Sequence, residues 1–128
     1  MRSPIRILLI DDDPDQCAYI SLCLDSQPGD RYQIVGMLAS GEAAIKEGLA
    51  LKPDLILIDI HLAGEIDGIE VGAYFRTKAE VPIVFLSSDT SFDTLELMKG
   101  VHPEAFIIKP CDEERLITVI ERLTGKKG

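Results

Sequence analysis

Four groups of polar residues in this sequence follow directly on short apolar segments. They combine carboxylates, hydroxyls and an amine, which are the side chains that bind metal ions and phosphoryl groups. The groups are Asp11, Asp12 and Asp13 after residues 5–10, Asp59 after residues 55–58, Ser87 and Ser88 around the end of residues 81–86, and Lys109 with Pro110 after residues 105–108.

The chemistry open to such a set is phosphoryl transfer to a carboxylate. Three carboxylates that lie close together raise each other's pKa unless a cation lies among them. Oxygen ligands with open positions suit Mg²⁺, which keeps several waters and takes one or two carboxylates plus a phosphate oxygen. A lysine ammonium and a serine hydroxyl complete a cradle for phosphoryl oxygens, and a carboxylate can attack phosphorus to form an acyl phosphate. If the four groups meet, they form an aspartyl-phosphate site.

The apolar segments themselves indicate how the groups could meet. They are short and rich in Ile, Val and Leu, as strands buried on both faces are. They alternate with segments of helical periodicity, which predicts an α/β fold, a doubly wound parallel sheet with five strands and five helices. Carboxyl ends of parallel strands share one edge of the sheet, where ligands bind in such folds. The predicted strands are Ile5–Ile10, Gln33–Leu38, Leu55–Ile58, Val81–Leu86 and Ala105–Ile108.

Helix signals between these strands are local. Pro14 suits the first turn of a helix, and Ser40 is a candidate N-cap with Ala43 where a capping-box Glu would stand. Helical spacing around Ala44 extends to Ala50, and Gly100 suits a helix end. We interpret Asp67 and Asp89 as turn or capping residues. The other periodic sets are Cys17, Ile20 and Leu24, and Leu116, Ile120 and Leu123.

Length, charge and cysteine content restrict the class of protein. The 128 residues suffice for one domain, with residues 4–124 as the expected core and residues 125–128 as a tail or the start of a linker. The net charge of −9 would repel a nucleic-acid backbone, so direct nucleic-acid binding is not expected. No apolar stretch reaches membrane-spanning length. Three cysteines without a C-x-x-C motif suggest free thiols in a reducing, cytoplasmic location.

The polar groups and their apolar strands also resemble a known family. The segments LLIDDDP, PDLILIDIHLAGEIDG, PIVFLSS and FIIKP stand in the order and at the spacing of the receiver domain of two-component response regulators. The resemblance covers nearly the whole chain. It implies a flavodoxin-like sheet with strand order 2-1-3-4-5, and a signalling switch rather than an enzyme.

The family pattern assigns a role to each matching residue. It implies that Asp59 accepts a phosphoryl group from a histidine kinase or histidine phosphotransfer protein, and that an output domain or partner protein reads the result. A phosphorylation-dependent homodimer is a family-level expectation. The implied residues are Asp11, Asp12, Asp59 and the backbone carbonyl of His61 for Mg²⁺ (with Mn²⁺ as an alternative), Ser87 and Lys109 for the phosphoryl oxygens, Phe106 as the switch aromatic, the Lys109–Pro110 bond as cis, and His61 and Asp89 as tuners of phosphoryl lifetime.

The sequence departs from the commonest pattern in the segment after Asp59. Ala63 stands where Pro is usual, and this loop is one residue longer before Asp67 and Gly68. Ser87 replaces the more frequent Thr but keeps the hydroxyl. These changes leave the predicted site intact.

Two other function classes remain open on the sequence alone. Asp11-Asp12-Asp13 satisfies the D-x-D spacing of aspartyl-phosphate hydrolases, in which Asp11 would be the nucleophile, but this leaves the segments around Asp59 and Lys109 unexplained. A pseudo-receiver would share the fold and bind partners without phosphorylation. Phe106 is as consistent with a core position as with a switching one.

Overall fold

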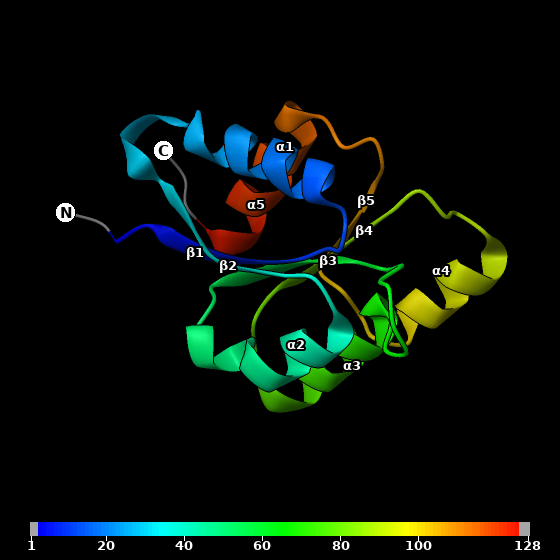
Figure 1. Ribbon diagram of the computed structural model, residues 1–128. Coiled ribbons are helices and arrows are strands. Elements are labelled where there is room, and N and C mark those ends of the chain that lie inside the picture. The colour runs from blue at the N-terminus through cyan, green and yellow to red at the C-terminus, as the bar shows by residue number, and fades with distance from the viewer. Residues whose placement is uncertain (1–2, 126–128) are drawn as a thin grey trace.

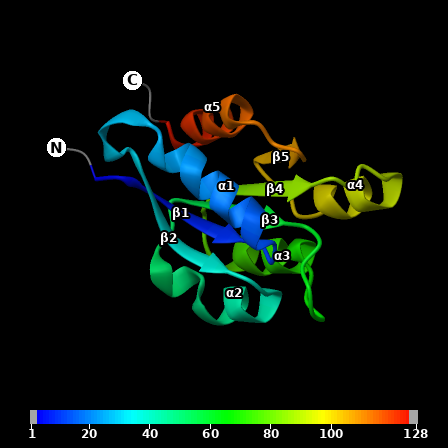
Figure 2. The ribbon, with the colours of Figure 1, turned by 45° about the horizontal axis from the view of Figure 1, so that its top comes forward.

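Five parallel strands form one sheet in the computed structural model, which describes residues 3–125. The order β2-β1-β3-β4-β5 can be followed in Figure 2. This confirms the predicted doubly wound architecture. Of the predicted tail, residues 126–128 lie outside the described residues. The strands are β1 (Ile5–Ile10), β2 (Tyr32–Leu38), β3 (Leu55–Asp59), β4 (Ile83–Ser87) and β5 (Ala105–Ile108).

Helices cover both faces of this sheet. Figure 1 shows α1 and α5 on one face and α2 and α3 on the other, with α4 beyond the carboxyl end of β4. The α-helices are α1 (Pro14–Asp25), α2 (Gly41–Glu47), α3 (Gly68–Lys78), α4 (Phe92–Lys99) and α5 (Glu113–Thr124), and two 3₁₀ turns span Pro28–Asp30 and Leu49–Leu51.

The central strand β1 divides its side chains between two cores. Ile7 and Leu9 pack with the buried residues of α1 and α5, and Leu8 and Ile10 pack with those of α2, α3 and α4. All four are fully buried. A strand enclosed on both faces has no polar face, which explains why its sequence is a continuous apolar run.

Most of the predicted element ends are confirmed. Pro14 lies in the first turn of α1, the Ser40 hydroxyl accepts a hydrogen bond from the Ala43 N–H at 3.0 Å, and Gly100 is the C-cap of α4. Asp67 is the N-cap of α3 and forms a complete capping box with Glu70.

Two predicted boundaries are wrong by two residues or more. Three others differ by one residue, since β2 begins at Tyr32, β3 ends at Asp59 and β4 ends at Ser87. The α-helix expected to reach Ala50 ends at Glu47, because the chain changes to 3₁₀ hydrogen bonding: the Leu51 N–H donates to the Gly48 carbonyl and the Lys52 N–H to the Leu49 carbonyl. The fourth strand begins at Ile83 rather than Val81, because Pro82 has no N–H to donate to the ladder.

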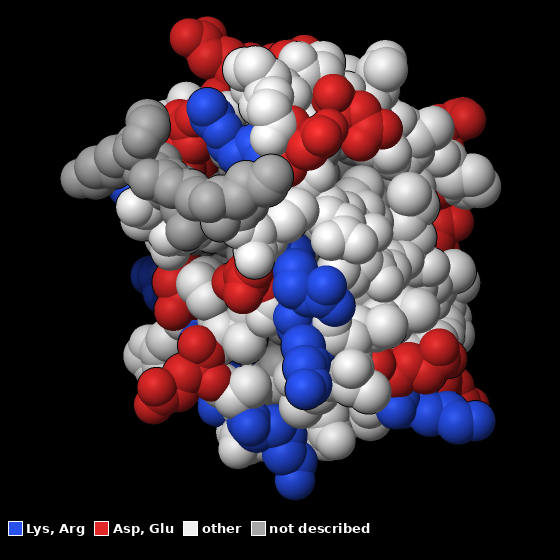
Figure 3. Space-filling model, turned by 90° about the vertical axis from the view of Figure 1, so that its left-hand side faces the viewer, with Lys and Arg blue, Asp and Glu red and all other residues white. Residues whose placement is uncertain are grey.

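At the amino-terminal edge of the sheet, Arg6 links β1 to the segment before β3 by hydrogen bonds. Its backbone N–H donates to the Asp54 carboxylate at 2.8 Å, and its guanidinium donates to the carbonyls of Leu51 and Lys52 at 2.7 and 3.0 Å. Figure 3 looks onto this edge and shows Lys and Arg side chains down the middle of the face, with acidic side chains on both sides. These bonds anchor the segment that leads into β3, and so help to fix the position of Asp59 at its other end.

Gly68 offers a test of how tightly the start of α3 packs behind the acceptor strand. A Cβ at this position would lie 2.0 Å from the Asp59 carbonyl oxygen and 2.7 Å from the Ile60 Cα. Because both are backbone atoms that cannot turn aside, we expect Gly68→Ala to lower the free energy of unfolding by at least about 2 kcal/mol in urea titrations. Gly100→Ala is the matched control, since Gly100 has a φ of −64° and its nearest contact would be 3.4 Å. Equal stability of the two variants would contradict the packing described here.

Candidate functional site

Three carboxylates meet at the carboxyl edge of the sheet. Asp11 follows β1, Asp59 ends β3, and the Ile10–Ile58 pairing of these adjacent strands places the two side by side. Asp12 completes the group, and one oxygen from each carboxylate lies within 4.8 Å of the others. Asp11 and Asp59 are only 2% and 6% exposed, whereas Asp12 is more open. The predicted meeting of the acidic residues is therefore observed, and this triad could hold a metal ion.

Lys109 supplies positive charge to the triad. It follows β5, and its Nζ lies 3.3 Å from Asp59 Oδ2 and 3.7 Å from Asp11 Oδ2. The bond between Lys109 and Pro110 is cis. One ammonium against three carboxylates leaves the group strongly anionic, an arrangement that favours a cation.

The effect of burial and of this crowded negative charge is clearest in the pKa of Asp11. Burial, together with the neighbouring Asp59 charge, raises its pKa from 3.8 to about 6, against the opposing effects of the Asp13 N–H and Lys109. Its Oδ1 accepts a hydrogen bond from the Asp13 N–H at 2.9 Å, but among the described residues its buried Oδ2 has no hydrogen-bond partner. A buried carboxylate oxygen without a donor fits a hard cation such as Mg²⁺, which binds oxygen ligands.

Ser87 lies at the end of β4, the strand next to the one that carries Asp59, and it is hydrogen-bonded to the loop that follows β4. It ends β4 and is 1% exposed. Its hydroxyl oxygen accepts a hydrogen bond from the Asp89 N–H at 2.9 Å. Ser88, by contrast, is exposed. Of the two serines considered from sequence, the structure buries Ser87 alone.

Asp89 links this loop to two other elements. Its carboxylate accepts hydrogen bonds from the Ser91 N–H at 2.9 Å and the Thr94 hydroxyl at 2.7 Å, and lies 3.0 Å from Nε2 of His61. The Ser91 N–H is the main reason that the pKa of Asp89 falls far below its ordinary value. Asp89 is thus the turn residue predicted, and it also joins α4 to the segment after Asp59.

That segment, which we call the acceptor loop (residues 60–67), is tied to the rest of the site by three polar contacts. The His61 N–H donates to Asp59 Oδ1 at 3.1 Å, and the His61 ring contacts Asp89. The Ala63 N–H donates to Asp12 Oδ2 at 2.8 Å. Sequence reasoning missed the roles of Ala63 and Thr94. The Ala63 contact is to a residue 51 positions away, which an alanine does not signal, whereas Thr94 contacts Asp89 only five positions before it. A Ser-x-x-Thr pattern at residues 91–94 could have indicated the α4 cap, which Ser91 forms.

Phe106 occupies a half-buried position on β5. It pairs in register with Phe85 and packs against the core on the α4 side of the sheet. An open hollow of about 480 Å³ lies beside it, lined also by Met98, His102 and Pro103. The ring therefore has core contacts on one side and free space on the other, so both sequence interpretations stay open.

Two further observations concern the cysteines and the length of the helices. Cys17, Cys23 and Cys111 are buried free thiols, as the sequence suggested. Within residues 3–125, none of the helices is long and apolar enough to cross a bilayer.

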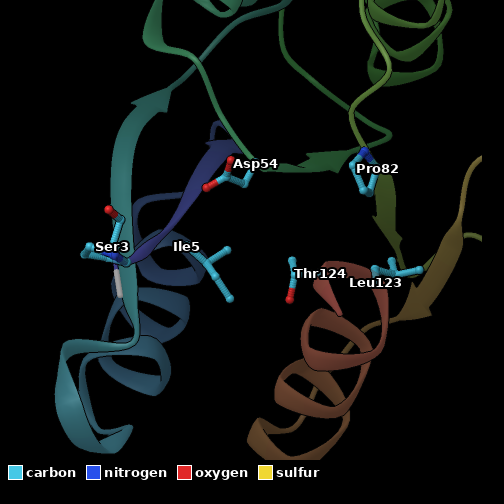
Figure 4. Close-up of a pocket in the computed structure, with 7 residues that line it drawn as sticks. Ser3, Ile5, Asp54, Pro82, Leu123 and Thr124 are labelled. Carbon is cyan, nitrogen blue, oxygen red and sulfur yellow. The ribbon is translucent and has the colours of Figure 1, made fainter. Parts of the chain in front are cut away.

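A second hollow, of about 470 Å³, lies at the amino-terminal edge. Figure 4 shows Ser3, Ile5, Asp54, Leu123 and Thr124 around it. Because Ile5 begins β1 and Asp11 follows its end, the two places are separated by the length of the strand, roughly 20 Å. This hollow is therefore not part of the acidic site.

Comparisons with known proteins identify what this arrangement is similar to. The family model for the response regulator receiver domain matches residues 7–121. The DNA-binding response regulator MtrA of Mycolicibacterium smegmatis is 32% identical over 114 residues, which are 88% of this chain and 47% of that protein. The chain thus spans about half the length of such relatives.

Solved structures of receiver domains have the same fold. The receiver domain of a modulated diguanylate cyclase from Desulfovibrio desulfuricans superposes with a TM-score of 0.88 at 28% identity, over 96% of this chain and 95% of that one. The receiver domain of sensor histidine kinase PA1611 from Pseudomonas aeruginosa, at 24% identity, has a TM-score of 0.84 over 97% of this chain and all of that one, and carries a magnesium ion in its active-site cleft.

The raised pKa of Asp11 leads to a pH-dependent prediction. Between about pH 4 and pH 6 the folded protein holds a proton on Asp11 that the unfolded chain has lost, so the free energy of unfolding falls as pH rises through this interval. The full shift corresponds to roughly 3 kcal/mol. We expect Asp11→Asn to stabilise the metal-free protein by about 1–3 kcal/mol near pH 7.5 and to give no gain near pH 4.

Denaturation in urea with a chelator present, at both pH values, measures this difference. Asp15→Asn is the matched control, since Asp15 is an exposed carboxylate in the same segment. A gain for Asp11→Asn that is equal at both pH values, or absent at the higher one, would show that the buried charge does not strain the fold.

Proposed function

The chain belongs to the response regulator receiver domain family, and on that premise we propose that Asp59 accepts a phosphoryl group from a histidine kinase or histidine phosphotransfer protein. A receiver domain is a phosphorylation-controlled switch rather than a classical enzyme, and the Asp11, Asp12 and Asp59 pocket is typical of a phosphoacceptor site. Family membership thus favours the switch over the D-x-D hydrolase considered from sequence.

The contact between Asp59 and Lys109 is the observation that carries this assignment. Among the three carboxylates, Asp59 has one oxygen, Oδ1, bonded to a backbone N–H and the other, Oδ2, 3.3 Å from the ammonium group. Asp11 lies further from that ammonium group, at 3.7 Å, and Asp12 is held by the acceptor loop. This short distance supports the proposal that Lys109 pairs with a phosphoryl oxygen attached to Asp59.

The transfer step conserves atoms and charge in a simple way. An oxygen of the Asp59 carboxylate forms a bond to phosphorus, the phosphorus–nitrogen bond of the donor phosphohistidine breaks, and its electron pair returns to the imidazole nitrogen, which takes up a proton. The product is an acyl phosphate on Asp59. Most of the work is positioning and charge neutralisation, as in phosphoryl transfer generally.

Mg²⁺ is the proposed cofactor, with Mn²⁺ as an alternative of similar ligand preference. Asp11, Asp12, Asp59 and the backbone carbonyl of His61 would hold it, and the bound ion would neutralise negative charge on the transferring group. The unpartnered Asp11 Oδ2 supports this proposal from within the chain. The magnesium ion of the PA1611 receiver domain supports it from a protein of the same fold.

Ser87 and Phe106 would convert the new charge into a change of surface. The Ser87 hydroxyl would donate to a phosphoryl oxygen in place of the Asp89 carbonyl, to which it donates at 3.5 Å, and Phe106 would turn toward the space left behind. The surface formed by α4, β5 and α5 would then be read by an output domain, a partner protein or a second copy of the chain. The single-domain organisation, cytoplasmic location and absence of direct nucleic-acid binding expected from the sequence stay predictions.

Phosphorylation with a small-molecule donor tests the assignment of Asp59. We expect acetyl phosphate with Mg²⁺ to add one phosphoryl group to the wild-type protein, detected by intact mass, and to add none to Asp59→Asn or to wild type with a chelator present. Asp54→Asn is a matched control, since Asp54 lies on the same chain segment at the far edge of the sheet. If wild type and Asp59→Asn are labelled alike, the phosphoacceptor assignment is wrong; if neither is labelled and Mg²⁺ does not bind, the pseudo-receiver interpretation replaces it.

The contact between His61 and Asp89 is proposed to set the lifetime of the phosphoryl group. The pair bridges the acceptor loop and the loop after Ser87, with the His61 side chain 60% exposed. Exposed pairs are worth about 1 kcal/mol or less. We therefore expect His61→Ala to speed loss of the phosphoryl group by roughly two- to fivefold, because attacking water gains freer access.

Release of inorganic phosphate from the purified acyl phosphate measures this rate. Glu96→Ala is a suitable control, since Glu96 forms a more exposed pair with Lys99 on α4. A rate for His61→Ala that is unchanged or slower than wild type would exclude the shielding role.

A further inference from the structure

The backbone of Ala63 makes a contact that the proposed function does not use. Its N–H donates a hydrogen bond of 2.8 Å to Oδ2 of Asp12, a residue 51 positions earlier in the chain. Asp12 is the most open of the three carboxylates and belongs to the short segment between β1 and α1. An exposed carboxylate on a connecting segment would otherwise rotate freely, so this bond restricts its orientation.

Packing on both sides of Ala63 holds this N–H in place. Leu62, the preceding residue, is buried against the core that contains α2 and α3. Ile66, three residues further, packs so closely on the start of α2 that a Cβ on Gly41 would lie 2.7 Å from its side chain. The acceptor loop is therefore fixed by apolar contacts before and after Ala63, and the donor is a defined feature of the loop.

We infer that the Ala63 N–H is a positioning group for the metal site, which holds the Asp12 carboxylate by one oxygen and leaves the other directed to the ion. The inference rests on the proposed Mg²⁺ site. Groups that hydrogen-bond metal ligands from outside commonly change metal affinity by tenfold or more when removed. The acceptor loop thus contributes to the site through a backbone group that only a substitution by proline removes.

Proline deletes this donor, because it has no N–H. Since proline is the usual residue here in the family, the inference is specific to this chain, whose acceptor loop is one residue longer. Ala63 is not among the described residues that have a positive φ, so its backbone does not conflict with the negative φ that proline requires. We expect Ala63→Pro to weaken Mg²⁺ binding about tenfold, as measured by titration of two-dimensional amide spectra in the absence of any phosphoryl donor. Ala63→Gly, which keeps the N–H, is the matched control and is expected to bind as wild type does.

A double-mutant cycle separates positioning from general damage to the loop. In an Asp12→Ala background the N–H has no carboxylate to hold, so Ala63→Pro should have no further effect on Mg²⁺ affinity. Amide hydrogen exchange gives a reading without proline, since exchange of the Ala63 N–H should be faster in Asp12→Ala than in wild type.

Each outcome decides the inference. A tenfold loss in Ala63→Pro that disappears in the Asp12→Ala background supports it. An equal loss in both backgrounds, an unchanged affinity, a tighter affinity from release of Oδ2 to the ion, or an Ala63 exchange rate that does not depend on Asp12 overturns it. If wild type and Ala63→Pro bind Mg²⁺ with the same affinity, this inference alone is wrong. If wild type binds no Mg²⁺, the proposed metal site is wrong as well.

Discussion

Mutual repulsion among three carboxylates is the interaction on which the rest of this structure depends. Oxygens of Asp11, Asp12 and Asp59 lie within 4.8 Å of one another, and two like charges about 4 Å apart near a protein surface repel by about 4 kcal/mol. The Lys109 ammonium offsets part of this. A site held in this state responds strongly to any cation or phosphoryl group that changes its charge, which is what a switch requires.

The sheet is what keeps the carboxylates together against this repulsion. The register that pairs Ile10 with Ile58 also places the next residues, Asp11 and Asp59, at neighbouring strand ends, with strands about 4.8 Å apart. Neither residue can move away without breaking ladder bonds between fully buried strands. The apolar cores on both faces therefore stabilise the arrangement that the charges oppose, and Asp11, whose pKa is raised, marks where the two effects meet.

The difference between buried strands and connecting loops also explains how much of the structure the sequence predicts. Apolar runs that end in polar residues determine both the strands and the edge where those residues meet, so the fold and the meeting of Asp11, Asp59, Ser87 and Lys109 could be predicted. Contacts made by loops could not, because a loop has no periodicity that reveals its path. The bond from Ala63 to Asp12 uses a backbone N–H, which every residue except proline carries, so nothing in the residue type points to it.

The connections of Asp89 suggest how a local change of charge reaches a distant surface. The Asp89 N–H donates to the Ser87 hydroxyl oxygen. The Asp89 carboxylate accepts from Ser91, the N-cap of α4, and from Thr94 in the first turn of that helix. A Ser87 hydroxyl that donated to a phosphoryl oxygen would give up its 3.5 Å hydrogen bond to the Asp89 carbonyl. Asp89 is also the residue that organises the start of α4. The acceptor loop is joined to the same residue through His61. One half-buried turn residue thus couples Ser87, α4 and the loop after Asp59, and two arrangements of this coupled unit are enough for a two-state switch.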